Sequence, residues 1–293
     1  MRKIKNILIA LLVLGVLIFA AGCGGTEPAP NPPAPPANGQ EATPPEKQEA
    51  AKDTLDVIKD RGVFVAGLDD GYPPMGFRDE KNELVGFDID MGNEIASRLG
   101  VKMEWQPTDW DGVIPSLKTK RFDVIISGMT ITPLREEEVN FTIPYVKAGV
   151  VALVKAGNKD GIQEPMDLSG KIVGIQGGSS GEDAVIELEE MEGFEKFKDV
   201  KRYKQFPECL EDLAIGRTDA AIVDNQVAAH FLDLRPGVYE IATPVNVEYF
   251  AIAVRKEDTK LLEELNRLIT EMKADGFLLE NSLEWFEGDV IPE

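Results

Sequence analysis

Apolar runs and amphipathic segments alternate along residues 53 to 293. The runs VFVAGL and FDVIISG predict buried strands, whereas DIDMGNEIASRLG repeats apolar residues at helical spacing before Gly100. Strands that alternate with helices indicate an α/β fold, in which mostly parallel sheets are covered by helices on both faces. Ligands of such sheets bind at the carboxyl ends of the strands, where the strand order reverses.

The same two patterns predict elements along the whole of this region. We expect strands at 63–68, 101–105, 122–128, 149–157, 171–175, 200–206, 219–224, 238–242 and 250–256. We expect helices at 88–100, 112–121, 182–192, 207–216, 225–234 and 258–276. The last helix should bury one face, formed by Leu261, Leu265, Leu268 and Met272.

The N-terminal pattern is different and predicts a targeting segment. MRKIKN is a basic n-region, and the apolar run of 14 residues from Ile7 to Ala20 is short for a membrane span but suits a signal-peptide core. The run ends in AAGC, which resembles a bacterial lipobox with Cys23 as the lipidated first residue of the mature chain. We therefore expect a lipoprotein signal peptide at 1–22. A single N-terminal anchor helix is the alternative.

Residues 23–53 predict a disordered tether behind that lipidated cysteine. The segment carries eight prolines and no apolar periodicity, so it cannot bury enough surface to offset its ordering entropy. Fully extended, it would reach at most about 90 Å. The body that follows has roughly 240 residues, which suffices for one large or two ordinary domains.

Charge and cysteine content exclude several kinds of partner and site. The net charge is −21, and loss of Arg2, Lys3 and Lys5 with the signal peptide brings it to about −24, which disfavours binding of nucleic acid. With Cys23 assigned to lipid, Cys209 stands alone and is expected in the core. No disulfide framework and no Cys/His metal spacing are present, so we expect no metal and no cofactor.

Polar and aromatic residues gather at the predicted carboxyl ends of strands. Together they supply a guanidinium, hydroxyls, loop amides, an aromatic ring and carboxylates, a set that suits a small ligand with both an anionic and a cationic group. These residues are Asp69, Asp70, Tyr72, Gly128, Met129, Thr130, Arg135 and Asp224, together with the glycine–serine turn at 177–181.

The glycine–serine turn allows two interpretations. Residues 177–181 match G-x-S-x-G, and Ser179, Asp224 and His230 follow the chain order of an α/β-hydrolase triad. However, His230 lies in a helix-like segment only six residues after Asp224, and no HGGG-like oxyanion segment precedes the turn. Free amides at a helix N-terminus bind a carboxylate or phosphate without any chemistry. We favour this anion-binding interpretation.

Three segments together resemble one protein family. GLDDGYPPMGFRDEKNELVGFDIDMGNEIASRLG, DWDGVIPSLKTKRFDVIISGMTITPLREEEVNFTIPY and AIGRTDAAIVDNQVAA are similar to the bacterial extracellular solute-binding proteins of family 3, which serve ABC importers of polar amino acids. The resemblance runs from about Leu55 to Phe286 and is most specific in GFDID and SGMTITPLR.

The resemblance implies a two-lobed periplasmic-binding-protein-like fold with two hinge crossovers (type II). Lobe 1 would comprise 54–145 plus 250–293, and lobe 2 would comprise 150–245. The hinges would lie near 146–149 and 246–249. In this family the two lobes close on a ligand held between them.

The resemblance also implies a role for each site residue. Arg135 would grip the ligand α-carboxylate, since its planar fork suits a carboxylate bidentately. Gly128 and Thr130 would add backbone and hydroxyl contacts beside it, and Ser180 would donate to the same carboxylate from lobe 2. Asp224 would accept from the α-ammonium. The ligand side chain would lie between Tyr72 and Trp110, with Asp69 at its far end.

The expected function is therefore capture of a polar amino acid outside the cytoplasm and its delivery to an ABC permease. The receptor would be a monomer that is held at the membrane by the lipid on Cys23. Because Asp69 would face the far end of the ligand, we expect basic amino acids to bind best, glutamine next, and acidic or aliphatic ones last. We do not expect an enzyme. The alternative is a cyclohexadienyl or arogenate dehydratase-like enzyme on the same fold, with Glu182 as an acid.

Overall fold

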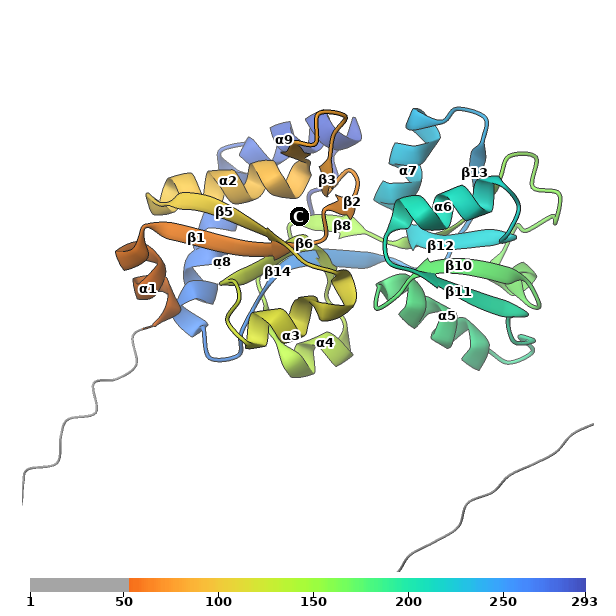
Figure 1. Cartoon of the computed structure of the whole chain (residues 1–293), viewed down its shortest axis with the longest axis horizontal. Coiled ribbons are helices and arrows are strands. Elements are labelled where there is room, and N and C mark those ends of the chain that lie inside the picture. The colour runs from red at the N-terminus through yellow and green to blue at the C-terminus, as the bar shows by residue number, and fades with distance from the viewer. Residues whose placement is uncertain (1–52) are drawn as a thin grey trace, which may run out of the picture. The chain divides into compact units, whose positions relative to one another are not determined.

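The computed structural model describes residues 53–293, which Figure 1 shows as a coloured ribbon. The predicted signal peptide, Cys23 and all but the last residue of the predicted tether lie outside the described residues. Where the description begins, Asp53 caps the first helix, α1 (Thr54–Arg61), by accepting a hydrogen bond from the backbone N–H of Leu55.

The first large sheet, sheet 1, has the strand order β5–β1–β6–β14–β7, with β8 paired to β14. Strand β1 pairs in parallel with β5 and β6, whereas β14 runs antiparallel to β6, β7 and β8. The bounds of these strands are β1 Val63–Leu68, β5 Lys102–Pro107, β6 Val124–Thr130, β7 Asn140–Phe141, β8 Val146–Ala148 and β14 Glu248–Val254.

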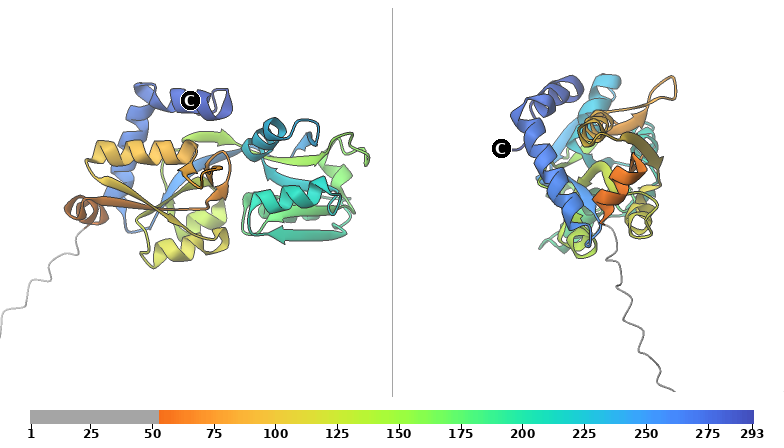
Figure 2. Two further views of the ribbon diagram at one scale, coloured as in Figure 1. Left: turned by 45° about the horizontal axis from the view of Figure 1, so that its top comes forward. Right: turned by 90° about the vertical axis from the view of Figure 1, so that its left-hand side faces the viewer.

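Helices cover both faces of sheet 1. In the central strand β6, Val124 and Ile126 belong to the core beneath α2, α8 and α9, whereas Ile125 belongs to the core beneath α3. Figure 2 shows α8 and α9 on the side of α2, with which both make contact. The bounds are α2 Phe87–Leu99, η1 Trp110–Gly112, α3 Val113–Lys118, α4 Pro133–Glu138, α8 Thr259–Ala274 and α9 Phe277–Phe286.

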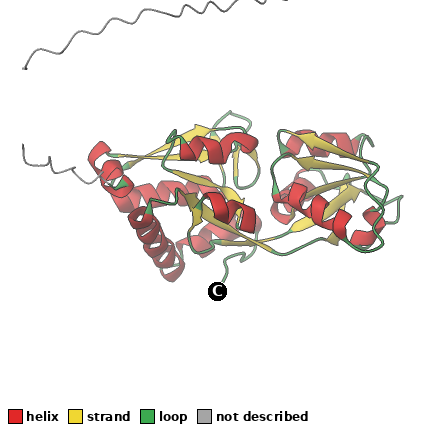
Figure 3. Ribbon diagram, turned by 90° about the horizontal axis from the view of Figure 1, so that it is seen from below, coloured by secondary structure: helices red, strands yellow, loops and turns green. Residues whose placement is uncertain are grey.

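The second large sheet, sheet 2, has the order β11–β10–β12–β9–β13. Its bounds are β9 Val150–Lys155, β10 Ile172–Gln176, β11 Asp199–Tyr203, β12 Ala220–Asp224 and β13 Tyr239–Pro244. As in sheet 1, neighbouring residues of the central strand face opposite sides of the sheet. Ile222 of β12 packs in the core beneath α5, and Ala221 packs in the core beneath α6 and α7. The surrounding helices are η2 Pro165–Leu168, α5 Ser180–Glu190, α6 Phe206–Ala214 and α7 Asn225–Leu234. Figure 3 shows helices on both sides of the strands.

We call sheet 1 with its helices lobe 1, and sheet 2 with its helices lobe 2. The chain passes from β8 into β9 and returns from β13 into β14, so it crosses between the sheets twice. The crossovers lie side by side: Glu248 pairs with Ala148, and the backbone N–H of Val150 donates to Asn246 Oδ1 at 2.8 Å. The predicted boundaries of the lobes and of the hinges remain predictions.

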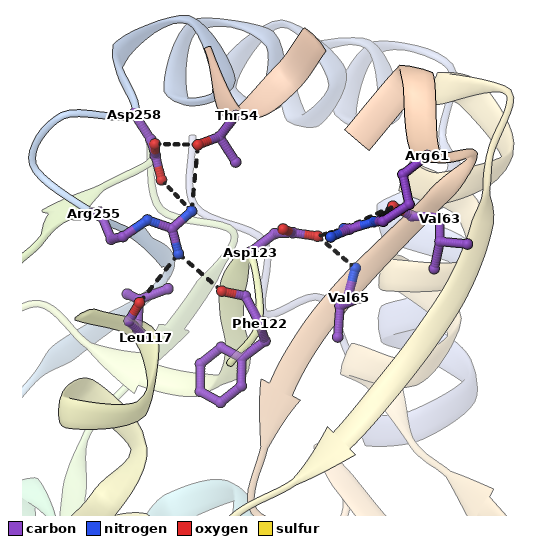
Figure 4. A network of polar contacts seen from close by, with 9 residues as sticks. All are labelled: Thr54, Arg61, Val63, Val65, Leu117, Phe122, Asp123, Arg255 and Asp258. Carbon is purple, nitrogen blue, oxygen red and sulfur yellow. Dashed lines mark hydrogen bonds and ion pairs between the residues drawn. The ribbon is translucent and has the colours of Figure 1, made fainter. Parts of the chain in front are cut away.

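A buried polar network ties α1 to the end of β14, as Figure 4 shows. The Arg255 guanidinium pairs with Asp258 at 2.6 Å and donates to the carbonyl oxygens of Leu117 and Phe122. Thr54 Oγ1 donates to Asp258 Oδ1 at 2.5 Å. A second pair, Arg61 with Asp123, joins the end of α1 to the start of β6.

The α/β prediction is confirmed, and each predicted strand and helix overlaps an observed one. The predicted apolar face of the last long helix is also observed, since all four of its named residues are buried in the core. Several observed elements were not predicted. They are α1, α4, α9, η2, the short strands β7 and β8, and a small sheet formed by β2 Gly71–Tyr72, β3 Gly76–Arg78 and β4 Leu84–Val85.

Candidate functional site

Most of the predicted site residues line one cavity between the two sheets. Seven of the eight do so, together with Gln176, Ser179 and Phe206, around a small cavity of about 10 Å³. The seven are Tyr72, Trp110, Gly128, Thr130 and Arg135 from lobe 1, and Ser180 and Asp224 from lobe 2. The cavity lies at the carboxyl ends of β6, β10 and β12, as expected for an α/β fold.

Arg135 supplies the positive charge of the cavity. It sits on the short helix α4, where Thr132 Oγ1 accepts its backbone N–H, and only 8% of the residue is exposed. Its Nη1 donates to the carbonyl of Thr130 at 2.9 Å and its Nη2 to the carbonyl of Gly178 at 3.0 Å. The guanidinium also lies over the Trp110 ring, 5.5 Å from its centroid. Since a guanidinium carries five N–H donors, others remain for an anion.

Burial lowers the pKa of Arg135, and the negative charges of Asp183, Glu248 and Asp224 act in the opposite direction. The guanidinium is still charged at neutral pH, because arginine does not lose its proton in proteins.

The glycine–serine turn places a helix N-terminus beside this arginine. Helix α5 begins at Ser180, and the first N–H groups of a helix have no acceptor within it. Gly178, at φ +74°, turns its carbonyl oxygen toward Arg135 and toward Trp110 Nε1, which donates to it at 2.9 Å. The anion-binding interpretation of the turn remains a prediction.

The hydrolase interpretation of the same turn fails on geometry. Ser179 Oγ donates to the carbonyl of Gln176 at 2.7 Å. The ring of His230 packs against Phe77 and Phe231, with centroids 5.5 and 5.6 Å away. Within residues 53–293, no hydrogen bond joins Ser179 to His230, so the serine has no general base.

Asp224 supplies a buried carboxylate opposite Arg135. It ends β12, is 6% exposed, and its Oδ2 accepts from the hydroxyl of Tyr72 in lobe 1 at 2.8 Å. Burial, followed by the negative charge of Glu248, raises its pKa to about 7, although the Tyr72 hydrogen bond and Arg135 act in the opposite direction. A cation at this carboxylate would favour its ionised form.

Gly128 offers less to a ligand than the resemblance implies. Its backbone N–H donates to Asp88 Oδ2 at 2.7 Å and is therefore not available to a ligand. At φ +47° a Cβ here would lie 2.6 Å from the Tyr72 ring, so the position requires glycine. Asp88 itself is fully buried, and burial raises its pKa to about 7.

Asp69 lies beside the cavity and is held by groups from both lobes. Its Oδ1 accepts from the backbone N–H of Gly71 at 2.9 Å and from Gln205 Nε2 at 3.2 Å, and its Oδ2 accepts from Gln176 Nε2 at 2.5 Å. Burial raises its pKa, while these hydrogen bonds act in the opposite direction. Its neighbour Asp70 points elsewhere and pairs with Arg78 at 2.7 Å.

Glu182, the residue suggested as an acid for a dehydratase, is committed to other partners. Its Oε2 accepts from the backbone N–H of Gly178 at 2.8 Å, and its Oε1 pairs with Arg202 at 2.5 Å. Partial burial favours the neutral form, but these two contacts prevail and lower the pKa of the carboxyl. A general acid needs a raised pKa, so the environment does not suit that role.

Four residues with polar contacts to the site were not predicted: Asp88, Gln176, Gln205 and Glu248. Gln176 is the last residue of β10, so the rule that selected other strand ends would have found it. Glu248 begins β14 rather than ending it, and Asp88 and Gln205 lie at helix N-termini, so no strand-end pattern marks these three.

The whole of this site falls within a match to one family model. Residues 64–288 match the model described as bacterial extracellular solute-binding proteins, family 3. The chain belongs to this family. The resemblance seen in the sequence is thereby confirmed, and so is the two-lobed fold class, since two-lobed amino-acid-binding proteins are its structural neighbours.

Individual members of the family give the scale of the similarity. The L-cystine-binding protein TcyJ of Escherichia coli (strain K12) is 36% identical over 249 residues, which are 83% of this chain and 90% of the relative. An ancestral arginine-binding protein bound to arginine has 41% identity and a TM-score of 0.72, covering 77% of this chain and 99% of that one.

One structural neighbour is related to an enzyme of the kind considered as the alternative function. It is the ancestral amino acid-binding protein AncCDT-1, described as a precursor of cyclohexadienyl dehydratase, with 37% identity, a TM-score of 0.73, and coverage of 80% of this chain and 99% of the neighbour. TcyJ and the ancestral arginine-binding protein are named as binding proteins.

Across residues 53–293 no helix is long and apolar enough to cross a membrane.

Proposed function

We propose that this protein is an extracytoplasmic receptor that captures a polar amino acid and delivers it to an ABC permease. One observation carries the proposal: a buried arginine at a helix N-terminus faces a buried aspartate across a single cavity between two lobes. That pairing of charges fits the zwitterion common to all α-amino acids. The names of relatives that bind cystine and arginine support the same class of ligand.

In the proposed mechanism, Arg135 on lobe 1 binds the α-carboxylate first. Lobe 2 then approaches by movement at 146–149 and 246–249, bringing Ser180 to the carboxylate and Asp224 to the α-ammonium. Tyr72 and Trp110 flank the ligand side chain, and Gly128 contributes its carbonyl oxygen. The ligand drives closure because it binds the closed arrangement more tightly than the open one.

We further propose that Asp69 and its two glutamines select the ligand side chain. A cationic side chain would pair with the buried carboxylate, and an amide could exchange hydrogen bonds with Gln176. An acidic side chain would place a like charge near Asp69, at a large cost in a dry cleft. The expected order is arginine, lysine or histidine, then glutamine, then acidic and aliphatic amino acids.

A thermal-shift screen over the twenty amino acids tests the proposal. A ligand at 100 times its Kd stabilises the protein by about 2.7 kcal/mol, so the bound class should be visible as a raised Tm. The same screen on Asp69→Asn should reduce the preference for basic over amide ligands. If glutamate outcompetes arginine on the unaltered protein, Asp69 does not set selectivity.

Titration calorimetry on Arg135→Ala then tests the assignment of the carboxylate site. Charge-assisted hydrogen bonds contribute about 1.5–3 kcal/mol each, so losing two should weaken binding by at least about 100-fold. Arg135→Lys is the matched variant, and it should recover little because an ammonium lacks the planar fork. Affinity of Arg135→Ala within a few-fold of the unaltered protein would contradict the assignment.

The proposal includes attachment to the membrane through lipid on Cys23 and a monomeric receptor. It excludes catalysis: the dehydratase alternative needs an acid of raised pKa, and Glu182 is hydrogen-bonded as an anion. Incubation with prephenate or arogenate is the direct check, and formation of an aromatic product would favour the enzyme.

A further inference from the structure

Glu248 is a buried carboxylate beside the cavity for which the proposed mechanism has no role. It is the first residue of β14, directly after the second crossover, and 9% of it is exposed. Its Oε2 accepts a hydrogen bond from Thr130 Oγ1 at 2.7 Å. Its Oε1 accepts from Asn246 Nδ2 at 2.9 Å.

These contacts restrict what Thr130 can do for a ligand. A threonine hydroxyl has one proton to donate and two lone pairs that accept. The Glu248 carboxylate oxygen, 2.7 Å away, is the strongest acceptor available to that proton, because hydrogen bonds to a carboxylate are about twice as strong as those to a neutral acceptor. The Oγ of Ser180 is 3.4 Å away and uncharged, so it does not compete. The Thr130 hydroxyl can therefore only accept a hydrogen bond from a ligand.

Asn246 holds the Glu248 carboxylate in the position from which it accepts the Thr130 hydrogen bond. Its side-chain oxygen accepts from the backbone N–H of Val150 at 2.8 Å, while its amide nitrogen donates to Glu248. Both ends of the asparagine are thus used, one on the first crossover and one on the second. The carboxylate of Glu248 is held in place by the two strands that connect the lobes.

We propose that Glu248 is a positioning residue: it holds the Thr130 hydroxyl as an acceptor, so that the site takes up an α-ammonium there. The inference rests on the proposed function, because it concerns how the same cavity recognises its amino acid. Thr130 then belongs with Asp224 on the cationic side of the ligand, and not beside Arg135 on the anionic side. Ligands that lack the α-amino group gain nothing from Glu248.

The test compares an amino acid with its deaminated analogue, namely arginine and 5-guanidinopentanoic acid, by titration calorimetry. In Glu248→Gln the new amide can donate to Thr130 Oγ1 and release its proton toward the ligand. One lost charge-assisted hydrogen bond corresponds to roughly a 10- to 100-fold loss for arginine. The analogue should lose less than about threefold. An equal loss for both ligands would overturn the proposal.

A double-mutant cycle separates positioning from simple charge. Thr130→Val removes the hydroxyl and keeps the charge of Glu248, so it should weaken arginine binding by a similar factor. If Glu248 acts through Thr130, the double variant should bind no worse than either single variant. If the two losses multiply, Glu248 acts by charge alone and the proposal fails.

Glu187→Gln is the matched control, because it removes one negative charge from an exposed residue of the groove that Glu248 also lines. It should leave both affinities unchanged.

Two further measurements complete the test. Circular dichroism of every variant shows whether it is folded. Glu248→Asp, which keeps the carboxylate, should recover part of the preference for arginine over its deaminated analogue. If the unaltered protein binds none of the amino acids, the proposed function fails. If it binds them, and Glu248→Gln leaves the ratio of the affinities for arginine and 5-guanidinopentanoic acid unchanged, only the positioning role fails.

Discussion

Asp224 is the residue at which burial has the clearest consequence for pH dependence. Its pKa of about 7 lies above the ordinary value of 3.8, mainly because burial penalises the charged form. Between pH 4 and 7 the folded state therefore holds a proton that the unfolded state has released. This contribution to stability is present at low pH and is lost as the pH rises through 7.

Asp224→Asn should remove that dependence. In the absence of ligand, the unaltered protein should lose about 2–3 kcal/mol more stability between pH 5 and 8 than the variant does. Urea unfolding of both proteins at four pH values measures the difference. Asp88, whose pKa is also raised to about 7, is present in both and cancels in the comparison.

The affinity for an amino acid should show the opposite trend, because the α-ammonium needs the ionised form of Asp224. Binding to the unaltered protein should strengthen from pH 5 to about pH 7.5 and then level off. Parallel loss of stability in the two proteins, or an affinity that is flat over this range, would mean that Asp224 is already ionised at pH 5.

At the scale of single residues, the sequence indicates which side chains stand at strand ends but not which of them meet. Arg135 and Asp224 could be selected because each lies at or near the end of a predicted buried strand. That Gln176 and Gln205 would pair with Asp69 could not be predicted, since they are 107 and 136 residues away from it in the chain. The same holds for Glu248, which is 118 residues from Thr130.

At the scale of elements, the network around Arg255 links α1 to the end of β14 through Thr54. The side chains of Arg255 and Asp258 are each 4% exposed. Burial raises the pKa of Asp258, and the hydrogen bond from Thr54 and the charge of Arg255 act in the opposite direction. Removal of the arginine would leave this carboxylate buried without its counter-ion.

Arg255→Ala should therefore cost about 3–5 kcal/mol in the free energy of unfolding, because the remaining charge is buried and unpaired. The matched control is Arg267→Ala on α8, whose guanidinium pairs with Glu264 and Glu271 at the surface. That variant should lose less than about 1 kcal/mol. Denaturant unfolding measures the free energy of unfolding of both variants. Similar losses of stability in the two would contradict the assignment of a buried ion pair.

The elements predicted from the sequence are those long enough to repeat their pattern. Strands β2, β3 and β4 have two or three residues, so alternation cannot show itself in them. Helix α9 follows α8 after only Asp275 and Gly276, and its apolar residues are readable as the tail of the longer helix. Contacts with α2 and α8 hold α9 in place, and a single segment of sequence does not contain them.

At the scale of the whole molecule, the proposed function assigns ligand binding and membrane attachment to different parts of the chain. All eight predicted ligand-binding residues lie between Asp69 and Asp224, far from Cys23. Under the proposed function, Cys23 alone provides the lipid anchor.

Cys23→Ser should release the protein from the membrane fraction into the soluble fraction without changing the ligand-induced shift in Tm. Cys209→Ser is the control, because that thiol is buried in lobe 2 and the substitution should leave attachment intact. Fractionation of cells expressing each variant is the measurement. Retention of Cys23→Ser in the membrane fraction would favour an uncleaved anchor helix.

The position of β14 within sheet 1 has a consequence for the order in which the chain can fold. Strand β14 comes after the whole of lobe 2 in the sequence, yet it lies between β6 and β7 in the sheet. A ribosome completes lobe 2 before it makes the strand that lobe 1 needs. Closing a contact over such a sequence separation is slow. Lobe 1 therefore cannot complete its sheet until residues 248–254 have been made, so it should reach its final fold after lobe 2.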